Sequence, residues 1–275
     1  MLTPIVKAFH DNASGTISYI VQDPSNKSCA VIDAVLDFDL SSGRTSTENA
    51  DKIIEFLKKE KLNLEWIIET HVHADHLSAA PYIQEEVGGK IGIGEEIQMV
   101  QDTFGKIFNE GTQFQRDGSQ FDRLFKDGDT YKIGTLNAKT IHTPGHTPAC
   151  MVHVIEDSAF VGDTLFAMGC GRLFEGTPEQ MWSSLNIIKG WPEKTQLFCA
   201  HEYTQANAEF ALTVDPDNEA LLKRKIDVEN LRNSNQPTVP TTLSIEKDTN
   251  PFLRANDSNI KAHLGMSQSS DLETF

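Results

Sequence analysis

The segment that decides how this chain is interpreted is His71-Val72-His73-Ala74-Asp75-His76, which closely follows the apolar stretch from 64 to 68. Imidazole suits zinc, iron, copper and nickel, and a mixed set of imidazoles and carboxylates with few thiolates is typical of a catalytic metal centre with an open position. So many ligands in six residues do not all reach one ion. His71 and His73 could face one ion, while Asp75 and His76 reach a second. A helix cap at Asp75 or Ser78 is the simpler alternative, but the density of the cluster favours metal binding.

A site for two ions needs further ligands from distant segments. His146 lies in the turn-forming stretch Thr143-Pro144-Gly145-His146-Thr147. Asp163 follows the apolar run 159–161 and a glycine, and His201 follows the apolar run 197–200. Each of these residues alone is more often structural than a ligand. Together with the cluster at 71–76 they complete a set of metal ligands.

With these residues in place, the chain resembles the metallo-β-lactamase superfamily, whose motif is His-x-His-x-Asp-His followed by a distant His, an Asp and a final His. The resemblance implies two divalent metal ions, with zinc expected and iron or manganese as alternatives. It assigns His71, His73 and His146 to the first ion, and Asp75, His76 and His201 to the second. Asp163 and a hydroxide would bridge both ions, so Asp75 and Asp163 are the expected catalytic carboxylates.

The second half of the chain resembles glyoxalase II, the hydroxyacylglutathione hydrolases. The resemblance rests on 169–177 (Gly-Cys-Gly-Arg-Leu-Phe-Glu-Gly-Thr), 201–204 (His-Glu-Tyr-Thr), 237–240 and 250–254. It implies hydrolysis of S-lactoylglutathione to lactate and glutathione, with the bridging hydroxide attacking the thioester carbonyl. Arg172, Phe174 and Tyr203 would line the glutathione pocket. Core packing is the alternative role of Phe174 and Tyr203.

The first half resembles members of the superfamily related to sulfur dioxygenases instead, in the segments 35–46, 71–81 and 118–122. Those enzymes oxidise glutathione persulfide with a single iron, held at positions that match His71, His146 and Asp163. The resemblance changes near 163–169, which indicates a chimera or an unusual lineage. A β-lactamase or lactonase, and a metal-binding scaffold without catalysis, are further alternatives.

Composition limits the partners of this chain. A formal net charge of −16 over 275 residues argues against binding to nucleic acid or to an anionic membrane surface. An anionic glutathione substrate then needs local positive charge, for which Arg172, Arg254 and Lys261 are the candidates. The basic pair that contacts glutathione near the end of glyoxalase II proteins has no match before Phe275, which predicts weaker substrate binding.

The cysteines and the hydropathy pattern bear on the location. The four cysteines show neither paired spacing nor a disulfide framework, and this predicts reduced thiols in the cytoplasm. No apolar run is long enough to span a membrane. Cys170 lies nearest the expected site, where a pocket-lining role is favoured over a nucleophile.

Strand and helix patterns alternate along the chain. Strands are predicted at 17–21, 29–32, 64–69, 90–93, 138–142, 151–155, 159–161 and 197–200, with an amphipathic helix over 47–59. Thr177 and Asp215, each followed by proline, are typical of helix starts. Read with the family resemblance, this order predicts an α/β fold, an αββα sandwich over residues 1–203 with the site at one sheet edge. A small helical substrate domain is expected over 204–275.

Overall fold

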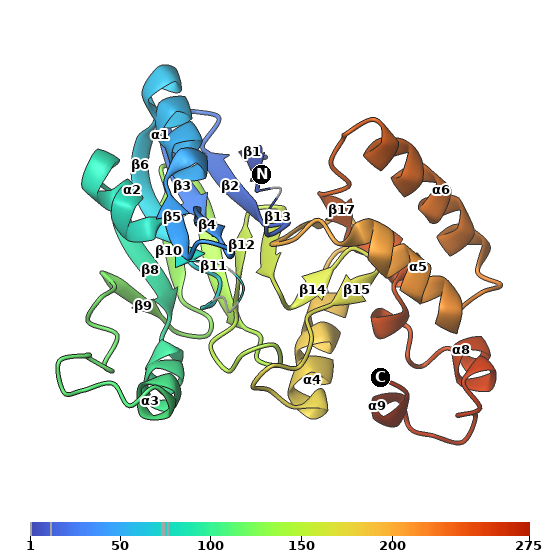
Figure 1. The fold of residues 1–275 in the computed structure, drawn as a ribbon. Helices are drawn as coiled ribbons and strands as arrows, with labels where there is room; N and C mark the ends of the chain where they lie inside the picture. Colours follow the sequence, from blue (N-terminus) through green and yellow to red (C-terminus); the bar gives the residue numbers. More distant parts are fainter. Residues whose placement is uncertain (1, 12, 73–74, 76) are drawn as a thin grey trace.

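A computed structural model describes residues 2–11, 13–72, 75 and 77–275. Two β-sheets form the centre of the molecule (Figure 1). The strand order of the first sheet is β1-β2-β3-β6-β8-β9, with bounds Ile5–His10, Ile17–Gln22, Ser28–Ile32, Asn63–Ile68, Lys90–Gly94 and Arg123–Phe125. The order of the second is β10-β11-β12-β13-β16-β17, with bounds Thr130–Ile133, Leu136–His142, Met151–Ile155, Ser158–Gly162, Gln196–Cys199 and Thr241–Thr242. The strands predicted from the sequence are all present.

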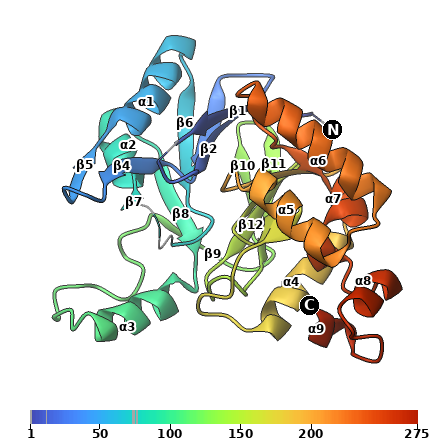
Figure 2. The same cartoon turned by 45° about the vertical axis from the view of Figure 1, so that its right-hand side comes forward.

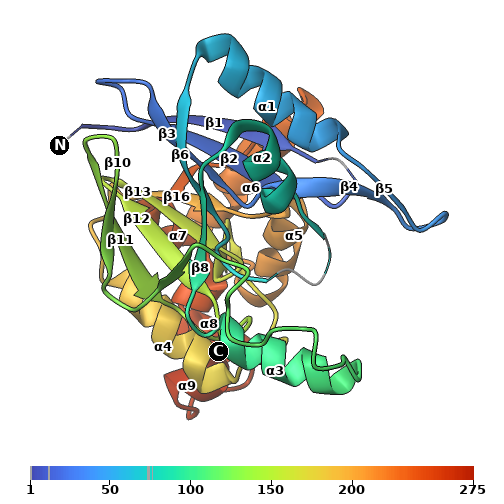
Figure 3. The same cartoon turned by 90° about the vertical axis from the view of Figure 1, so that its left-hand side faces the viewer.

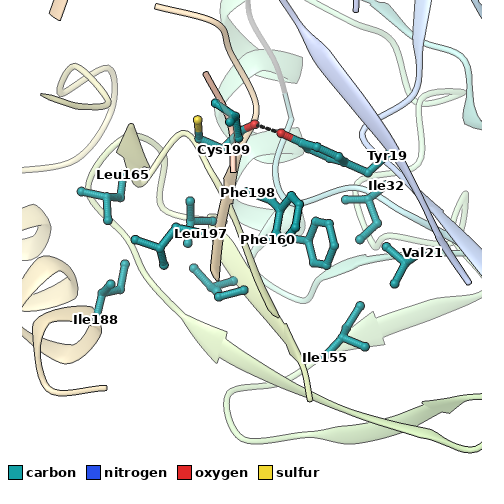
Figure 4. Packing of buried hydrophobic residues seen from close by; sticks show 14 of the residues in the cluster. Tyr19, Val21, Ile32, Ile155, Phe160, Leu165, Ile188, Leu197, Phe198 and Cys199 are labelled. Atoms are coloured by element: carbon teal, nitrogen blue, oxygen red, sulfur yellow. Dashed lines mark hydrogen bonds between the residues drawn. The ribbon is translucent and has the colours of Figure 1, made fainter. Parts of the chain in front are cut away.

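Side-chain alternation along the strands builds the core. Tyr19 and Val21 of β2 pack between the sheets, whereas Ile20 between them faces the opposite way, into a second apolar cluster. Tyr19 lies against Phe160 and Phe198 of the second sheet, and its hydroxyl donates a 2.6 Å hydrogen bond to the carbonyl of Cys199 (Figure 4). The core is therefore shared by both sheets, directly behind the strand end that leads to position 201.

Helices cover both outer faces. The helices α1 (Glu48–Glu60), α2 (Ala80–Val87) and α3 (Ile97–Ile107) accompany the first sheet, and α4 (Pro178–Lys189) packs on the second (Figure 3). In α1 the residues Ala50, Ile53, Ile54 and Leu57 are buried, as the helical spacing predicts. The helix start predicted at Thr177 is confirmed, and Thr177 forms a capping box with Gln180 at the start of α4. The αββα sandwich predicted from the sequence is confirmed.

Short strands complete the edges. The hairpin of β4 (Val35–Asp39) and β5 (Arg44–Ser46) pairs with β7 (Leu77–Ser78), and β14 (Leu165–Phe166) pairs with β15 (Gly169–Cys170). No described helix is both long and apolar enough to cross a membrane.

The rest of the chain is mainly helical and lies on the side of the molecule away from α1, α2 and α3 (Figures 1 and 2). Its elements are α5 (Thr204–Val214), α6 (Glu219–Asn233), α7 (Leu243–Thr249), η1 (Pro251–Leu253), α8 (Ser258–His263) and α9 (Asp271–Thr274). Helices α5 and α6 have a small apolar cluster of their own, with Met168, Ala208 and Leu221. The prediction of a capping Asp215 is wrong, because α6 begins later and is capped by Asn218, while Asp215 ends α5. The domain division at 203/204 stays a prediction.

Candidate metal centre

The candidate ligands lie where strands end. Asp163 and His201 closely follow β13 and β16, which pair in parallel, so their carboxyl ends meet at the same edge of the second sheet. His71 follows β6, which is parallel to β3 and β8. His146 comes from the loop between β11 and β12. Segments far apart in the sequence are thus directed to one place between the sheets.

The ligand atoms converge on Asp163. His71, His146 and Asp163 are buried and offer ligand atoms that all lie within 4.8 Å of one another. The Oδ2 atom of Asp163 is 3.8 Å from Nε2 of His71 and 3.5 Å from Nε2 of His146. Its other oxygen, Oδ1, is 3.5 Å from Nε2 of His201, and this nitrogen is 3.4 Å from Oδ2 of the exposed Asp75. Asp163 therefore lies between two groups of ligands. His73 and His76, the other predicted ligands, lie outside the described residues.

In His71 and His146, the nitrogen that points away from Asp163 makes a hydrogen bond. These bonds determine the tautomer of each ring. Nδ1 of His146 lies 2.8 Å from the carbonyl oxygen of Arg172, which can only accept, so Nδ1 carries the proton. Near His71, the hydroxyl of Thr70 donates to the Asp33 carboxylate at 2.9 Å, which leaves its oxygen to accept from Nδ1 of His71 at 3.0 Å. With Nδ1 as the donor, Nε2 is the nitrogen of each ring that can offer a lone pair to a metal ion.

This donor set fits a metal ion. Imidazole nitrogens and a carboxylate, which are common ligands of divalent cations, lie within 4.8 Å of one another in a buried space. The chemistry of the residues therefore supports a metal centre, and the wider arrangement of His201 and Asp75 offers ligands for a second ion.

The glycine-rich segment after Asp163 closes around these ligands. Gly171 packs so tightly that a Cβ atom there would lie 1.9 Å from the carbonyl oxygen of Asp163. A few residues later, the backbone N–H groups of Phe174 and Glu175 both donate to the carbonyl of His146, at 3.1 Å. The segment thus contacts the backbone of two candidate ligands.

A polar cavity of about 370 Å³ opens beside the centre. Asp75, His146 and Asp163 form its wall next to the ligands, and Arg172, Tyr203 and Asn207 supply groups that can bind a peptide. The ring of Tyr203 stacks on that of His201, with centroids 4.6 Å apart, and burial raises the pKa of Tyr203 to about 12, so its hydroxyl is protonated at neutral pH. Burial likewise raises the pKa of the Cys170 thiol, in the same wall, to about 12, which disfavours a thiolate nucleophile.

Two features differ from what the sequence led us to expect. Phe174 does not line this cavity with Arg172 and Tyr203. It lines a neighbouring cavity, with its ring 6.3 Å from that of His146. Arg254 is held by Asp215 and Asp257, and Lys261 by Asp271 at 2.7 Å, so their charges are compensated within the C-terminal region. Of the three candidate cations, Arg172 is the one that lines the polar cavity.

The sequence reading missed Asp33, Thr70 and Asn207. Asp33 directly follows β3, a strand end like those before the predicted ligands, and that signal could have found it. Thr70 precedes His71, but a single threonine has no distinctive spacing. Asn207 lies on α5, one helical turn after Tyr203, where an asparagine is indistinguishable from a surface residue in the sequence.

Comparison with protein families matches the metallo-beta-lactamase superfamily over residues 12–201 and the hydroxyacylglutathione hydrolase C-terminus over residues 202–275. Among curated proteins, a probable metallo-hydrolase of Burkholderia pseudomallei is 46% identical over 212 residues, 72% of each chain. A hydroxyacylglutathione hydrolase of Maricaulis maris is 38% identical over 264 residues, 95% of this chain and 91% of that protein.

Among solved structures, ETHE1 from Myxococcus xanthus aligns with a TM-score of 0.64 at 22% identity, covering 96% of this chain and 90% of that one. At this identity the likeness concerns the fold alone.

Proposed function

Since this chain belongs to the metallo-β-lactamase superfamily and its last part matches the C-terminus of hydroxyacylglutathione hydrolases, we propose that it is a metal-dependent hydrolase of S-acylglutathione thioesters. The observation that carries the proposal is the convergence of buried imidazoles on Asp163 beside a cavity that contains Arg172, Tyr203 and Asn207. The match to the Maricaulis maris hydrolase, which spans nearly the whole chain, supports it.

The ligands would divide between two ions. His71, His73 and His146 would hold the first, and Asp75, His76 and His201 the second, with Asp163 between them. We expect zinc, with iron or manganese as alternatives. Two such ions would make water nucleophilic near neutral pH and polarise the thioester carbonyl.

The side chains around the centre orient the substrate. The Arg172 guanidinium would bind a carboxylate of glutathione, and the Tyr203 hydroxyl and the Asn207 amide would bind its peptide groups. Asp163, which lies between the imidazoles, would supply a carboxylate ligand at the centre of the set. In the reaction a C–O bond forms and the C–S bond breaks, giving a carboxylate and glutathione. A thiol has a pKa near 8.5, so the sulfur leaves with little acid assistance.

A second candidate function has one observation in its favour. The tight group of His71, His146 and Asp163 is a set of two histidines and one carboxylate, the arrangement typical of non-haem iron oxygenases. It matches the single-iron site implied by the resemblance of the first half, so oxidation of glutathione persulfide is the alternative. In that case Asp75, His76 and His201 would take no part in metal binding.

One assay separates these functions. Protein loaded with zinc or with iron is supplied in turn with S-lactoylglutathione and with glutathione persulfide, while release of thiol and consumption of oxygen are followed. The proposal predicts thiol release from the thioester without oxygen consumption. Oxygen consumption with persulfide by the iron-loaded protein, without thioester cleavage, would move the assignment to the dioxygenase.

The role of Arg172 is tested with Arg172→Ala and with Arg44→Ala, which changes an exposed arginine of the β4–β5 hairpin. The first variant should raise KM for the thioester about tenfold or more with a smaller effect on kcat, because it removes a charge that binds substrate and transition state alike. The second should behave like the wild type. Equal KM values in the wild type, Arg172→Ala and Arg44→Ala would show that Arg172 does not bind glutathione.

The location and the partners follow from the same argument. The described cysteines are free thiols, which supports a reducing compartment, and we propose the cytoplasm.

The expected partner is a small glutathione thioester. The exclusion of nucleic acid and anionic membranes stays a prediction from the net charge of −16.

A further inference from the structure

A second cavity, of about 540 Å³, lies on the α3 side of the metal centre. Its apolar wall is formed by Ile97, Val100 and Phe104 of α3 and by Phe108, Phe114 and Phe121 of the segment that follows. A volume of this size is within the range of pockets that bind small molecules, roughly 300–1,000 Å³. Three phenylalanines that line the cavity are substantially exposed, Phe108 at 68%, Phe174 at 44% and Phe114 at 39%, which leaves aromatic surface in water for a ligand to cover.

This cavity borders the candidate metal centre. His146 lines both it and the polar cavity, so one face of each space is a predicted metal ligand. Phe174 lies beside His146 on the apolar side, and the Arg172 guanidinium is 6.0 Å from the Phe174 ring centroid. The two cavities therefore lie on either side of a predicted metal ligand, where the two parts of a thioester would be expected.

The two cavities differ in chemistry. The polar one has Arg172, Tyr203 and Asn207, the last two from the chain around the start of α5. The apolar one is formed largely by α3 and its following segment, and α3 and α5 lie on opposite sides of the molecule in both views (Figures 1 and 2). A charged peptide suits the first cavity, and an uncharged hydrocarbon suits the second.

The polar members of the apolar cavity also disfavour a charged occupant. Gln101 donates from its amide nitrogen to Gln120 at 2.9 Å, and its oxygen accepts from the N–H of Gly118 at 3.0 Å, so this side chain is engaged within the protein. Glu175, the acidic group in the wall, would repel a carboxylate at the end of an acyl chain.

We propose that this cavity is the acyl subsite, and that the enzyme prefers thioesters of uncharged, medium-length apolar acyl groups over lactoyl and acetyl thioesters. The inference rests on the proposed thioester hydrolase function and names its substrate class. The reaction is balanced by water alone: the acyl carbon gains oxygen from water, the C–S bond breaks, and the products are a fatty carboxylate, glutathione and a proton.

The first test is a series of S-acylglutathiones with acetyl, butanoyl, hexanoyl and octanoyl groups, with S-succinylglutathione as a charged comparison. Each methylene that enters the cavity should raise kcat/KM by roughly fourfold, until the cavity is filled. The succinyl thioester should be poorer than the butanoyl one, which has the same number of acyl carbons. A flat or falling profile with chain length would overturn the inference and leave the thioesterase function standing.

Substitutions in the cavity test whether it is the source of the acyl-chain preference. Phe108→Asp and Phe114→Asp each place a carboxylate in the cavity at a partly exposed position, so the fold should survive. They should lower the ratio of octanoyl to acetyl kcat/KM by at least tenfold. Ile107→Asp is the matched control, because Ile107 is 65% exposed at the end of the same helix and does not line the cavity. A ratio unchanged in Phe108→Asp and Phe114→Asp would contradict the assignment.

Binding separates a failure of this inference from a failure of the proposed function. S-methylglutathione and S-octylglutathione are thioethers that cannot be hydrolysed, and calorimetry measures their affinities without turnover. If no thioester is cleaved, the hydrolase proposal fails. Tighter binding of the octyl compound, lost in Phe108→Asp, would still support the apolar subsite. Equal affinities of the methyl and octyl compounds would refute the apolar subsite. It would also be refuted if light scattering showed a dimer that Phe108→Asp dissociates, because the apolar surface would then be an interface between two copies of the chain.

Discussion

At the scale of single residues, the candidate metal centre would depend on side chains that are not themselves predicted ligands. Thr70 links His71 to Asp33 through two hydrogen bonds, and its backbone N–H donates a further one to Asp33 at 2.7 Å. This chain of contacts selects the tautomer of His71 that offers Nε2 as a ligand. Groups that orient a metal-binding histidine in this way affect the affinity for the metal.

Thr70→Val tests this role, because it keeps the shape of the side chain and removes the hydroxyl. We expect the affinity for the metal to fall by about 10- to 100-fold. Competition with a chelator measures it directly, without reliance on turnover. Thr70→Ser, which restores the hydroxyl, should recover most of the affinity. Equal metal affinity in Thr70→Val and the wild type would show that the hydroxyl does not orient His71.

The sequence identified the candidate ligands better than the residues around them. The positions of His71, Asp163 and His201 follow from short apolar runs that end in a ligand-type residue, which is a local pattern. The ion pairs that neutralise the charge of Arg254 could not be predicted, because one of its partners, Asp215, lies 39 residues away in the sequence. Contacts of this kind depend on how helices pack, and the sequence pattern contains no trace of them.

At the scale of elements, α4 supports the loop that carries His146. Ser184 donates a 2.7 Å hydrogen bond to the carbonyl of Pro144, and Gly145 lies directly against the first turn of α4. Gly145 has a φ of +148°, and a Cβ atom there would lie 2.6 Å from Cα of Met181. The Pro-Gly-His sequence therefore serves close packing as well as turn formation.

Gly145→Ala should displace either the loop or the helix. We expect a loss of about 1–3 kcal/mol in the free energy of unfolding, together with weaker metal binding, since His146 moves with the loop. Gly190→Ala is the control, because Gly190 has a φ of −78° and its added Cβ would meet nothing nearer than 3.4 Å. Denaturant titration measures the free energy of unfolding of both variants. A Gly145→Ala protein as stable as Gly190→Ala would contradict this account of α4.

Helix starts show what the sequence can and cannot predict at this scale. Thr177, Pro178 and Gln180 predicted the start of α4 correctly, because a capping box is complete within four residues. Asp215 before Pro216 matched a similar pattern, yet Asn218 caps α6. Asp215 is instead held by Arg254, so a tertiary ion pair outweighs the local preference. The apolar cavity beside α3 could not be predicted either, because the phenylalanines that follow α3 have neither strand nor helix periodicity.

At the scale of the whole molecule, a buried carboxylate joins the two sheets. Asp23, in the turn between β2 and β3, accepts hydrogen bonds from Ser25 and, across the sandwich, from the backbone and the hydroxyl of Thr135 in the turn between β10 and β11. Burial alone would raise the pKa of Asp23, but the hydrogen bonds from Ser25 and Thr135 outweigh burial and hold it below the ordinary value of 3.8. The folded state thus favours the ionised carboxylate.

Asp23→Asn should lower the free energy of unfolding at pH 7 by about 2 kcal/mol, the usual contribution of hydrogen bonds to a charged group. Because the folded-state pKa is lowered, the contribution of the carboxylate is complete above pH 3.8 and is lost as the pH falls toward that lowered pKa. The difference between wild type and variant should therefore shrink below about pH 4. Asp217→Asn, at an exposed position between α5 and α6, is the control. A difference that does not change with pH would exclude ionisation of Asp23 as the cause.

The measurement that tests the central claim most directly is a metal count made on the same sample as a thioester assay, for the wild type and for His201→Ala. The account predicts two metals per chain and S-acylglutathione hydrolysis in the wild type. In His201→Ala it predicts the loss of one metal and a fall in kcat of at least about 100-fold, because one ligand of the second ion is gone. Hydrolysis at the wild-type rate in His201→Ala, or a fully active wild type with one metal per chain, would contradict it.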